Sequence, residues 1–101
     1  MSAGVVGIDA DGQITIVNRA AARLLNAAPE ELEGRHYSEV VPELAGLIRK
    51  AISEPVGRAS GEVTVKRTGT PRSLSAQVPS ETGTHNGYVV TFDDITDLVS
   101  A

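Results

Sequence analysis

The spacing of apolar and polar residues changes twice along the chain. Near the amino end, two runs of apolar, largely β-branched residues flank Asp9-Ala10-Asp11-Gly12, and an Asp-Gly turn between such runs is typical of a β-hairpin. From Arg19 to Ser53 the apolar residues recur every three or four positions, which predicts helices. From Gly61 to Phe92 the alternation returns, with a turn at Thr68-Gly69 and a polar loop over Pro79 to Gly87. The pattern therefore predicts two strands, a helical region and then three strands.

The first helix is expected to begin after Asn18, because a short side-chain amide can accept from the free N–H groups of a first helical turn. Asn26 is a residue that tolerates the left-handed conformation common at a helix end. The apolar face expected for this helix consists of Ala21, Leu24, Leu25 and Ala28. Asn18 is thus predicted to be a structural cap.

Two further helices are predicted, which makes three helical pieces in all. Pro29 suits a first helical turn, where its missing N–H is not needed, and Gly34 can end that short helix with a positive φ. After a brief segment from His36 to Val41, Pro42 begins the longest helix, and Pro55 ends it. The apolar stripe of this helix consists of Leu44, Leu47, Ile48, Ala51 and Ile52. These positions follow the spacing of one helical face.

The connections between the last three strands are too short for the crossovers that parallel pairing requires. We therefore expect one antiparallel sheet with the helices packed on one of its faces, which is an α+β fold.

Composition restricts the function. A chain of 101 residues with 41% apolar residues forms one modest domain. Its formal charge of -4, with no basic cluster, argues against binding to nucleic acid or directly to a membrane. Cysteine is absent, no apolar stretch is long enough to span a bilayer, and no leader is recognisable at the amino end. A cytoplasmic location is the natural expectation.

Candidate catalytic and metal-binding residues are few. The two histidines are His36 and His85; the first is expected to cap or to lie at the rim of a site, and the second to be solvated in a polar loop. Glu39 and Glu43 could approach one another, but a solvated acidic face is the simpler interpretation. Glycine-rich phosphate loops are missing. We expect no catalytic residue and no metal site, and hydrolase activity has no defensible nucleophile and base.

Several segments in order resemble a PAS domain: residues 7–21, the run Glu30 to Arg35, and Gly87 to Phe92 followed by Asp94-Ile95-Thr96. The run from Gly87 to Ser100, with Val40 to Glu43, more narrowly resembles the cytoplasmic PAS domain of NtrY-type nitrogen-regulation sensor histidine kinases. The resemblance implies a five-stranded antiparallel sheet in the order 2-1-5-4-3.

The same resemblance implies a non-enzymatic sensory or relay module of a homodimeric two-component sensor histidine kinase. Residues 1–96 would form the PAS domain. Residues 97–101 would begin a signalling helix, truncated here, that continues into the dimerisation helices of the kinase. The parent could be anchored in the inner membrane by segments outside this chain.

Cofactors are judged against the same family. Light-sensing relatives use a flavin-reactive cysteine, which this chain lacks, and haem-binding relatives carry a histidine on the long helix, where this chain has none. We therefore expect no cofactor, although a haem or flavin sensor remains the alternative function and a small organic ligand is compatible with the sequence. The candidates for lining a ligand pocket are His36, Tyr37, Leu47 and Ile48, of which Leu47 and Ile48 equally suit a filled core.

The last strand ends at Asp93 and Asp94. Asp94 can cap the following helix, or pair with a basic residue of a neighbouring strand: Lys66, Arg67 or Arg72. The functional interpretation assigns Asp94, Ile95 and Thr96 to signal coupling between the sheet and the outgoing helix.

Overall fold

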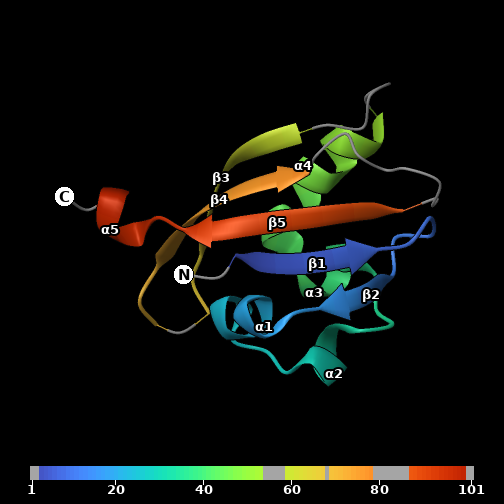
Figure 1. Cartoon of the computed structure of the whole chain (residues 1–101), viewed down its shortest axis with the longest axis horizontal. Helices are drawn as coiled ribbons and strands as arrows, with labels where there is room; N and C mark the ends of the chain where they lie inside the picture. Colours follow the sequence, from blue (N-terminus) through green and yellow to red (C-terminus); the bar gives the residue numbers. More distant parts are fainter. Residues whose placement is uncertain (1–2, 54–58, 68, 79–86, 100–101) are drawn as a thin grey trace.

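The computed structural model of the chain describes residues 3–53, 59–67, 69–78 and 87–99. Five strands form one antiparallel sheet in the order β2-β1-β5-β4-β3, as the resemblance implied (Figure 1). The strands are β1 (Gly4–Ile8), β2 (Ile14–Val17), β3 (Ala59–Val65), β4 (Arg72–Val78) and β5 (Tyr88–Asp94). The predicted helix stop at Pro55 and most of the predicted loop, with His85, lie outside the described residues.

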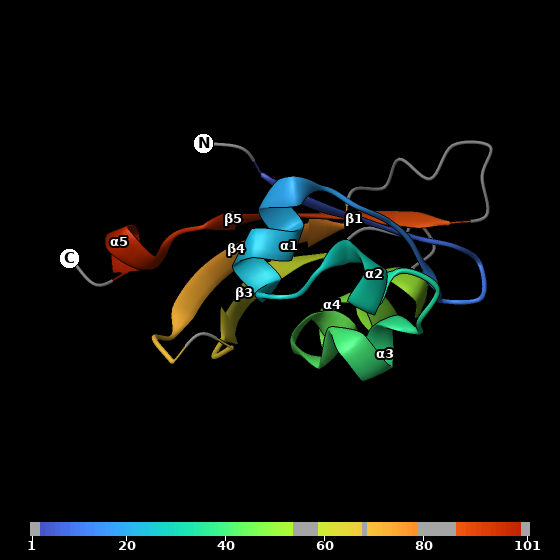
Figure 2. The same cartoon turned by 90° about the horizontal axis from the view of Figure 1, so that it is seen from below.

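The helices are α1 (Arg19–Leu25), α2 (Pro29–Leu32), α3 (Tyr37–Val40), α4 (Pro42–Ser53) and α5 (Thr96–Val99). Four of them lie between β2 and β3, so the prediction of three helical pieces was wrong. The additional helix, α3, is a single turn, too short to show an apolar period. Figure 2 shows the sheet nearly edge-on with α2, α3 and α4 on one side of it. None of the helices in the described part of the chain is long and apolar enough to cross a bilayer.

The core lies between the helices and the covered face of the sheet. Val90 and Phe92 of β5 have no exposed surface, and neither do Leu44 and Ile48 of α4. The other fully buried large side chains include Ile14, Leu25, Leu32, Leu74, Val6, Val41, Val65 and Val78. Burial of this apolar surface is the main force that holds the two layers together.

Two positions of the predicted apolar faces were wrong. Ala28 is exposed, because α1 ends at Leu25 and Ala28 already precedes α2. Ile52 is 44% exposed near the end of α4, where Ala51 turns towards the core instead. In both cases the helical period was extended beyond the part of the helix that packs on the sheet.

Asn18 is the N-cap of α1, in the position that the sequence predicted. Its Oδ1 accepts from the N–H of Ala21 at 2.8 Å and from the N–H of Val5 at 2.9 Å. Its Nδ2 donates to the carbonyl oxygen of Ala3 at 2.9 Å. One amide thus satisfies a free N–H of the helix and also fixes α1 to β1. Asn26 ends the helix with φ 51°.

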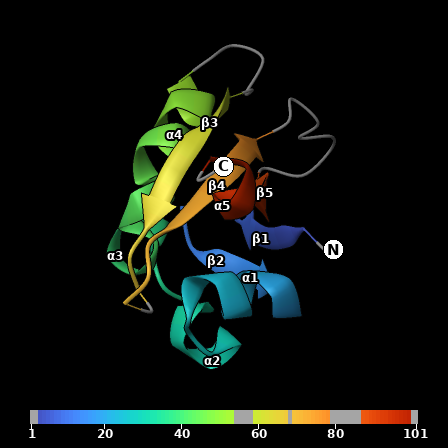
Figure 3. The same cartoon turned by 90° about the vertical axis from the view of Figure 1, so that its left-hand side faces the viewer.

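The final helix, α5, lies apart from the other helices. In Figure 1 it follows the carboxyl end of β5 at the left, and Figure 3, seen from that side, shows it in front of β4 and β5. Leu98 and Val99 are 78% and 58% exposed, so α5 buries little of its apolar surface within this chain.

Candidate functional site

The start of α5 is held by a group of polar contacts, here called the α5 node: Arg72, Ser73, Asp94, Ile95 and Thr96. Asp94 Oδ2 accepts from Arg72 Nη1 at 2.7 Å. The N–H of Ile95 donates to the carbonyl oxygen of Ser73 at 2.8 Å. The backbone of β4 is therefore hydrogen-bonded to Ile95, the residue between the end of β5 and the start of α5.

Thr96 completes the α5 node. Its N–H and its hydroxyl both donate to Asp94 Oδ1, and its Oγ1 accepts from the N–H of Ser73 at 3.0 Å. The hydrogen bond from the Thr96 hydroxyl is the largest cause that lowers the pKa of Asp94, and the Thr96 N–H and Arg72 add to it against the opposing effect of desolvation. The carboxylate therefore stays charged at neutral pH and bridges β4 and α5.

Asp94 makes both of the contacts that the sequence suggested for it, the cap and the ion pair. It accepts from the first turn of α5, as a capping residue does, and it pairs with a basic residue. Of the three basic candidates, Arg72 is the partner. Leu74 of β4 pairs in register with Asp94, and Arg72 lies two residues before Leu74 on the same face of that strand. Arg67 pairs elsewhere.

His36, one of the candidates for lining a ligand pocket, is engaged in contacts of its own. His36 caps α3: its Nδ1 lies 2.8 Å from Ser38 Oγ and accepts from the Ser38 N–H at 3.2 Å. Its ring stacks on Tyr37, with the ring centroids 4.5 Å apart. The far side of the ring lies against Gly12, which has φ 86° and where a Cβ atom would overlap His36. These contacts occupy His36 at the β1–β2 turn.

The other three candidates belong to the core or to its margin. Tyr37 is 5% exposed and Ile48 is fully buried, and both lie in the central apolar cluster. Leu47 is half-buried and packs against that cluster. Their common role in this arrangement is to fill the space between α3, α4 and the sheet.

The side chains that an axial haem ligand on α4 and covalent flavin chemistry would require are missing from this chain. Helix α4, where haem-binding relatives are expected to place their histidine, contains no histidine, and the chain has no cysteine for flavin chemistry. Within the described part of the chain, no three histidine or acidic residues come together as a metal site would require.

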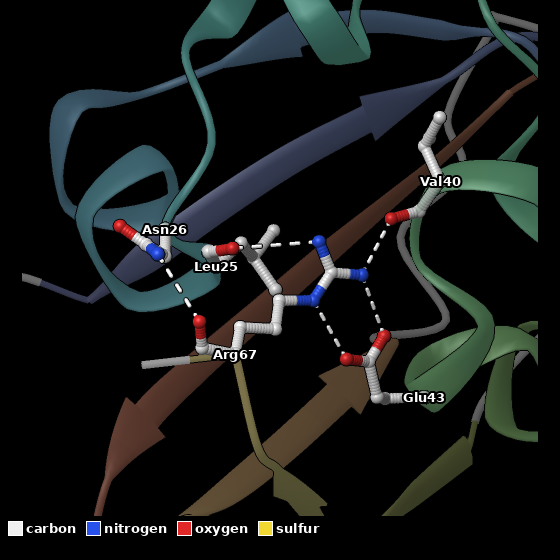
Figure 4. Close-up of polar contacts among 5 residues, drawn as sticks. All are labelled: Leu25, Asn26, Val40, Glu43 and Arg67. Atoms are coloured by element: carbon white, nitrogen blue, oxygen red, sulfur yellow. Dashed lines mark hydrogen bonds and ion pairs between the residues drawn. The ribbon is translucent and has the colours of Figure 1, made fainter. Parts of the chain in front are cut away.

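A second group of polar contacts was not predicted. We call it the helix-layer node: Leu25, Asn26, Val40, Glu43 and Arg67 (Figure 4). Arg67 Nε donates to Glu43 Oε2 and Arg67 Nη2 donates to Glu43 Oε1, both at 2.7 Å. Nη2 also donates to the carbonyl oxygen of Val40 at 2.6 Å, and Nη1 to that of Leu25 at 3.4 Å. A single guanidinium therefore binds α4 and the last residues of α1 and α3.

The charges of the helix-layer node reinforce each other. The hydrogen bond from Arg67 lowers the pKa of Glu43 and outweighs desolvation, and the same bond raises the pKa of Arg67. The interpretation of Glu39 and Glu43 as a solvated acidic face was wrong for Glu43, whose side chain is only 20% exposed. The side chain of Glu39 is 61% exposed, and its Oε2 lies 3.7 Å from Arg35 Nη2. No local pattern could have revealed the pair, since Glu43 and Arg67 are 24 positions apart.

The face of the sheet that carries no helix has apolar side chains. Ile16 and Val89 are 60% and 43% exposed, and both pair in register with Gly7 of β1. Gly7 itself is buried, and the side chain of Ile16 lies against the space that a Cβ atom at Gly7 would occupy. We call Ile16, Gly7 and Val89 the open-face strip.

The comparisons with known proteins agree with this architecture. The profile of the family described as PAS fold matches residues 1–95. The chain belongs to the PAS family. As a PAS domain it is a sensory module and not a catalytic domain, as the sequence predicted.

The narrower resemblance is also confirmed. The chain is 43% identical, over its whole length, to part of the nitrogen regulation protein NtrY of Azorhizobium caulinodans, and it spans 13% of the length of that protein. The PAS domain of nitrogen regulation protein NR(II) from Vibrio parahaemolyticus has a similar fold, with a TM-score of 0.69 and 19% identity over 92% of this chain and 89% of that one.

A second solved structure with the same fold is the photoactive yellow protein domain of the sensor histidine kinase Ppr from Rhodospirillum centenum. Its TM-score is 0.75 and its identity is 18%, over 92% of this chain and 86% of that one. At this identity the likeness concerns the fold alone.

Proposed function

We propose that this PAS domain is a relay in an NtrY-like sensor histidine kinase, in which it couples a conformational signal to a helix that continues from α5. Residues 1–96 form the sensory unit, and residue 97 onward belongs to the outgoing helix. The α5 node is the observation that carries this proposal. Asp94, Ile95 and Thr96 attach α5 to two strands at once, so that a displacement of β4 relative to β5 changes the direction in which α5 leaves the sheet.

Dimerisation is the second part of the proposal. The open-face strip and the exposed Leu98 and Val99 offer apolar surface outside the core. In the parent kinase, a second copy would cover this surface and bring two α5 helices together, next to the dimerisation helices of the kinase. A displacement of α5 then changes the arrangement of the helix pair.

We further propose that the domain works without a resident cofactor. The space between the helices and the sheet holds one continuous apolar cluster, in which Phe92, Leu74 and Ile48 are fully buried. This continuous apolar cluster favours a conformational relay over a haem or flavin sensor, and over a small organic ligand among Tyr37, Leu47 and Ile48. We place the domain in the cytoplasm, without direct contact with a membrane or nucleic acid.

The coupling is tested by Asp94→Ala in the longer kinase. We expect altered autophosphorylation, because the substitution removes the acceptor for Thr96 and Arg72, while the circular dichroism of the 101-residue chain remains that of a folded domain. Asp93→Ala is the matched control: Asp93 is an adjacent exposed aspartate on the other face of β5. Unchanged output from Asp94→Ala under all signalling conditions would refute the coupling.

The other two parts need separate experiments. Ile16→Glu combined with Val89→Glu is expected to weaken the dimer of the longer protein, measured by sedimentation equilibrium, and an unchanged dissociation constant would exclude the open-face strip as the interface.

Native mass spectrometry of the purified chain distinguishes a filled core, which adds no mass, from a retained ligand. An absorption band in the visible region would establish a coloured cofactor instead.

A further inference from the structure

The helix-layer node and the α5 node are held by the same β-hairpin. Arg67 follows β3, Arg72 begins β4, and Arg72 pairs in register with Val65 at the end of β3. The two arginines therefore belong to the two ends of the β3–β4 connection. Arg67 is directed to the helices, and Arg72 is directed to Asp94 and the start of α5.

The geometry of Arg67 depends on where three helices lie. Its two donors to Glu43 come from the planar edge of the guanidinium, which fixes the orientation of the group relative to α4. In this orientation its remaining N–H groups reach Val40 and Leu25, the last residues of α3 and α1. Carbonyl groups at a helix end have no partner within the helix. All four bonds form together only when α1, α3 and α4 have this one arrangement.

The backbone of Arg67 is tied to the same helices. Asn26, the left-handed residue that ends α1, donates from Nδ2 to the carbonyl oxygen of Arg67 at 3.1 Å. A movement of α1 against α4 would therefore pull on both the side chain and the main chain at the end of β3. Because β3 and β4 are paired along their whole length, the movement reaches Arg72 at the opposite side of the turn.

From this arrangement we propose that Arg67 is a latch that holds α1, α3 and α4 in one arrangement and passes a change in that arrangement through the β3–β4 hairpin to α5. The inference rests on the proposed function in one respect, namely that the position of α5 is the output. It adds an input to the relay, namely the relative positions of α1, α3 and α4, on which the contacts of Arg67 depend. The latch is closed when Arg67 binds Glu43, Val40 and Leu25, and it is open when the guanidinium leaves them.

The test is amide hydrogen exchange of the 101-residue chain by NMR, with Arg67→Met. The reporters for the helix layer are the N–H groups of Ala27 and Val41, which donate to Ala22 and Tyr37. The reporters for α5 are the N–H groups of Ile95 and Val99. Relative to the wild-type chain, we expect exchange to accelerate about tenfold in the helix layer and about threefold or more at α5, while Val90 in the centre of the sheet reports the loss of global stability.

Arg35→Met is the matched control. It removes the same charge, and its ion pair with Glu39 is longer and well exposed. We expect the amides of α5 to be unaffected by it. If Arg35→Met changes α5 as Arg67→Met does, the effect is one of net charge and the latch is refuted. It is also refuted if all amides, Val90 included, accelerate equally, because that is a loss of global stability.

A second variant keeps the proposal testable if Arg67→Met does not fold. Glu43→Gln leaves an acceptor for Arg67 but removes the charge, and we expect smaller changes in the same amides. Acceleration in the helix layer without any change at Ile95 and Val99, in either variant, would overturn the transmission to α5. Adding Arg72→Met should abolish the additional effect of Arg67→Met on α5.

These results are separable from the proposed function. If Arg67→Met leaves α5 unchanged while Asp94→Ala alters kinase output, the latch fails and the relay stands. If Arg67→Met alters α5 while Asp94→Ala leaves output unchanged, the latch is established and the proposed output is wrong.

Discussion

The helix-layer node and the α5 node are both built on an arginine of the β3–β4 hairpin, yet they hold very different amounts of structure. Arg67 is 23% exposed and binds three helices that are also packed on the core. Arg72 is 41% exposed, and the helix at its node has no buried residue. The comparison indicates that polar contacts reinforce apolar packing in the helix layer, whereas at α5 they are the main attachment. In the relay proposed above, a helix held in this way changes its direction without unfolding the domain.

The largest expected difference between the two nodes is in global stability. Arg67→Met should lower the free energy of unfolding by about 2–3 kcal/mol, because it leaves the largely buried Glu43 carboxylate without its partner. Arg72→Met should cost less than about 1 kcal/mol, since its ion pair is more exposed. Urea unfolding followed by circular dichroism measures both. Equal losses would contradict the division of roles drawn here.

Thr96→Val sharpens the comparison on the side of α5. The substitution keeps the shape of the side chain but removes the hydroxyl that donates to Asp94 and accepts from the Ser73 N–H. We expect a cost of about 1 kcal/mol, concentrated in faster amide exchange at Ile95 and Val99. Thr64→Val, on the exposed face of β3, is the control. An effect spread evenly over the sheet would show that α5 is part of the cooperative core.

The dependence of stability on pH should differ between variants of the helix-layer node. The pKa of Glu43 is lowered in the folded state by its hydrogen bond with Arg67. A lowered carboxyl pKa stabilises the fold above the unfolded value and ceases to do so as the pH falls through the folded value. The stability advantage of the wild type over Glu43→Gln should therefore be largest above about pH 5 and shrink below about pH 4. Urea midpoints at several pH values test this; a constant difference would assign the effect to packing.

The smallest effect is expected at the exposed side chains of α5. Leu98→Ser should change the free energy of unfolding of this chain by less than about 0.5 kcal/mol, since Leu98 is 78% exposed. In the longer protein we expect the same substitution to weaken dimerisation, measured by sedimentation equilibrium. A large loss of stability in the 101-residue chain would mean that α5 packs on the domain more closely than this structure shows.

Local features of the sequence were sufficient for much of the fold. The turn at Asp9 to Gly12, the cap at Asn18 and the left-handed end at Asn26 each depend on residues within a few positions of one another. The alternating pattern identified β4 and β5, and the family resemblance supplied the order of the strands. The helical spacing of apolar residues gave a wrong prediction at Ala28, where it was continued past the end of α1. It also missed α3, which is a single turn.

The candidate site was only partly visible in the sequence. Asp94 and Thr96 were named as candidates because they lie two positions apart at the end of a strand. Three basic residues were equally acceptable partners for Asp94, and register alone selected Arg72. The pairing of Arg67 with Glu43 was missed altogether.

The sequence by itself determined most of the segments that become strands and helices, where α1 is capped, and that the chain is a PAS domain, because these depend on short-range patterns and on a family-wide order of motifs. The tertiary structure decided which charges meet. Glu43 and Arg67 come from elements far apart in the chain, and only the packing of α4 against β3 brings them together. An ion pair needs its two groups within a few ångströms of each other, and no periodicity encodes that distance.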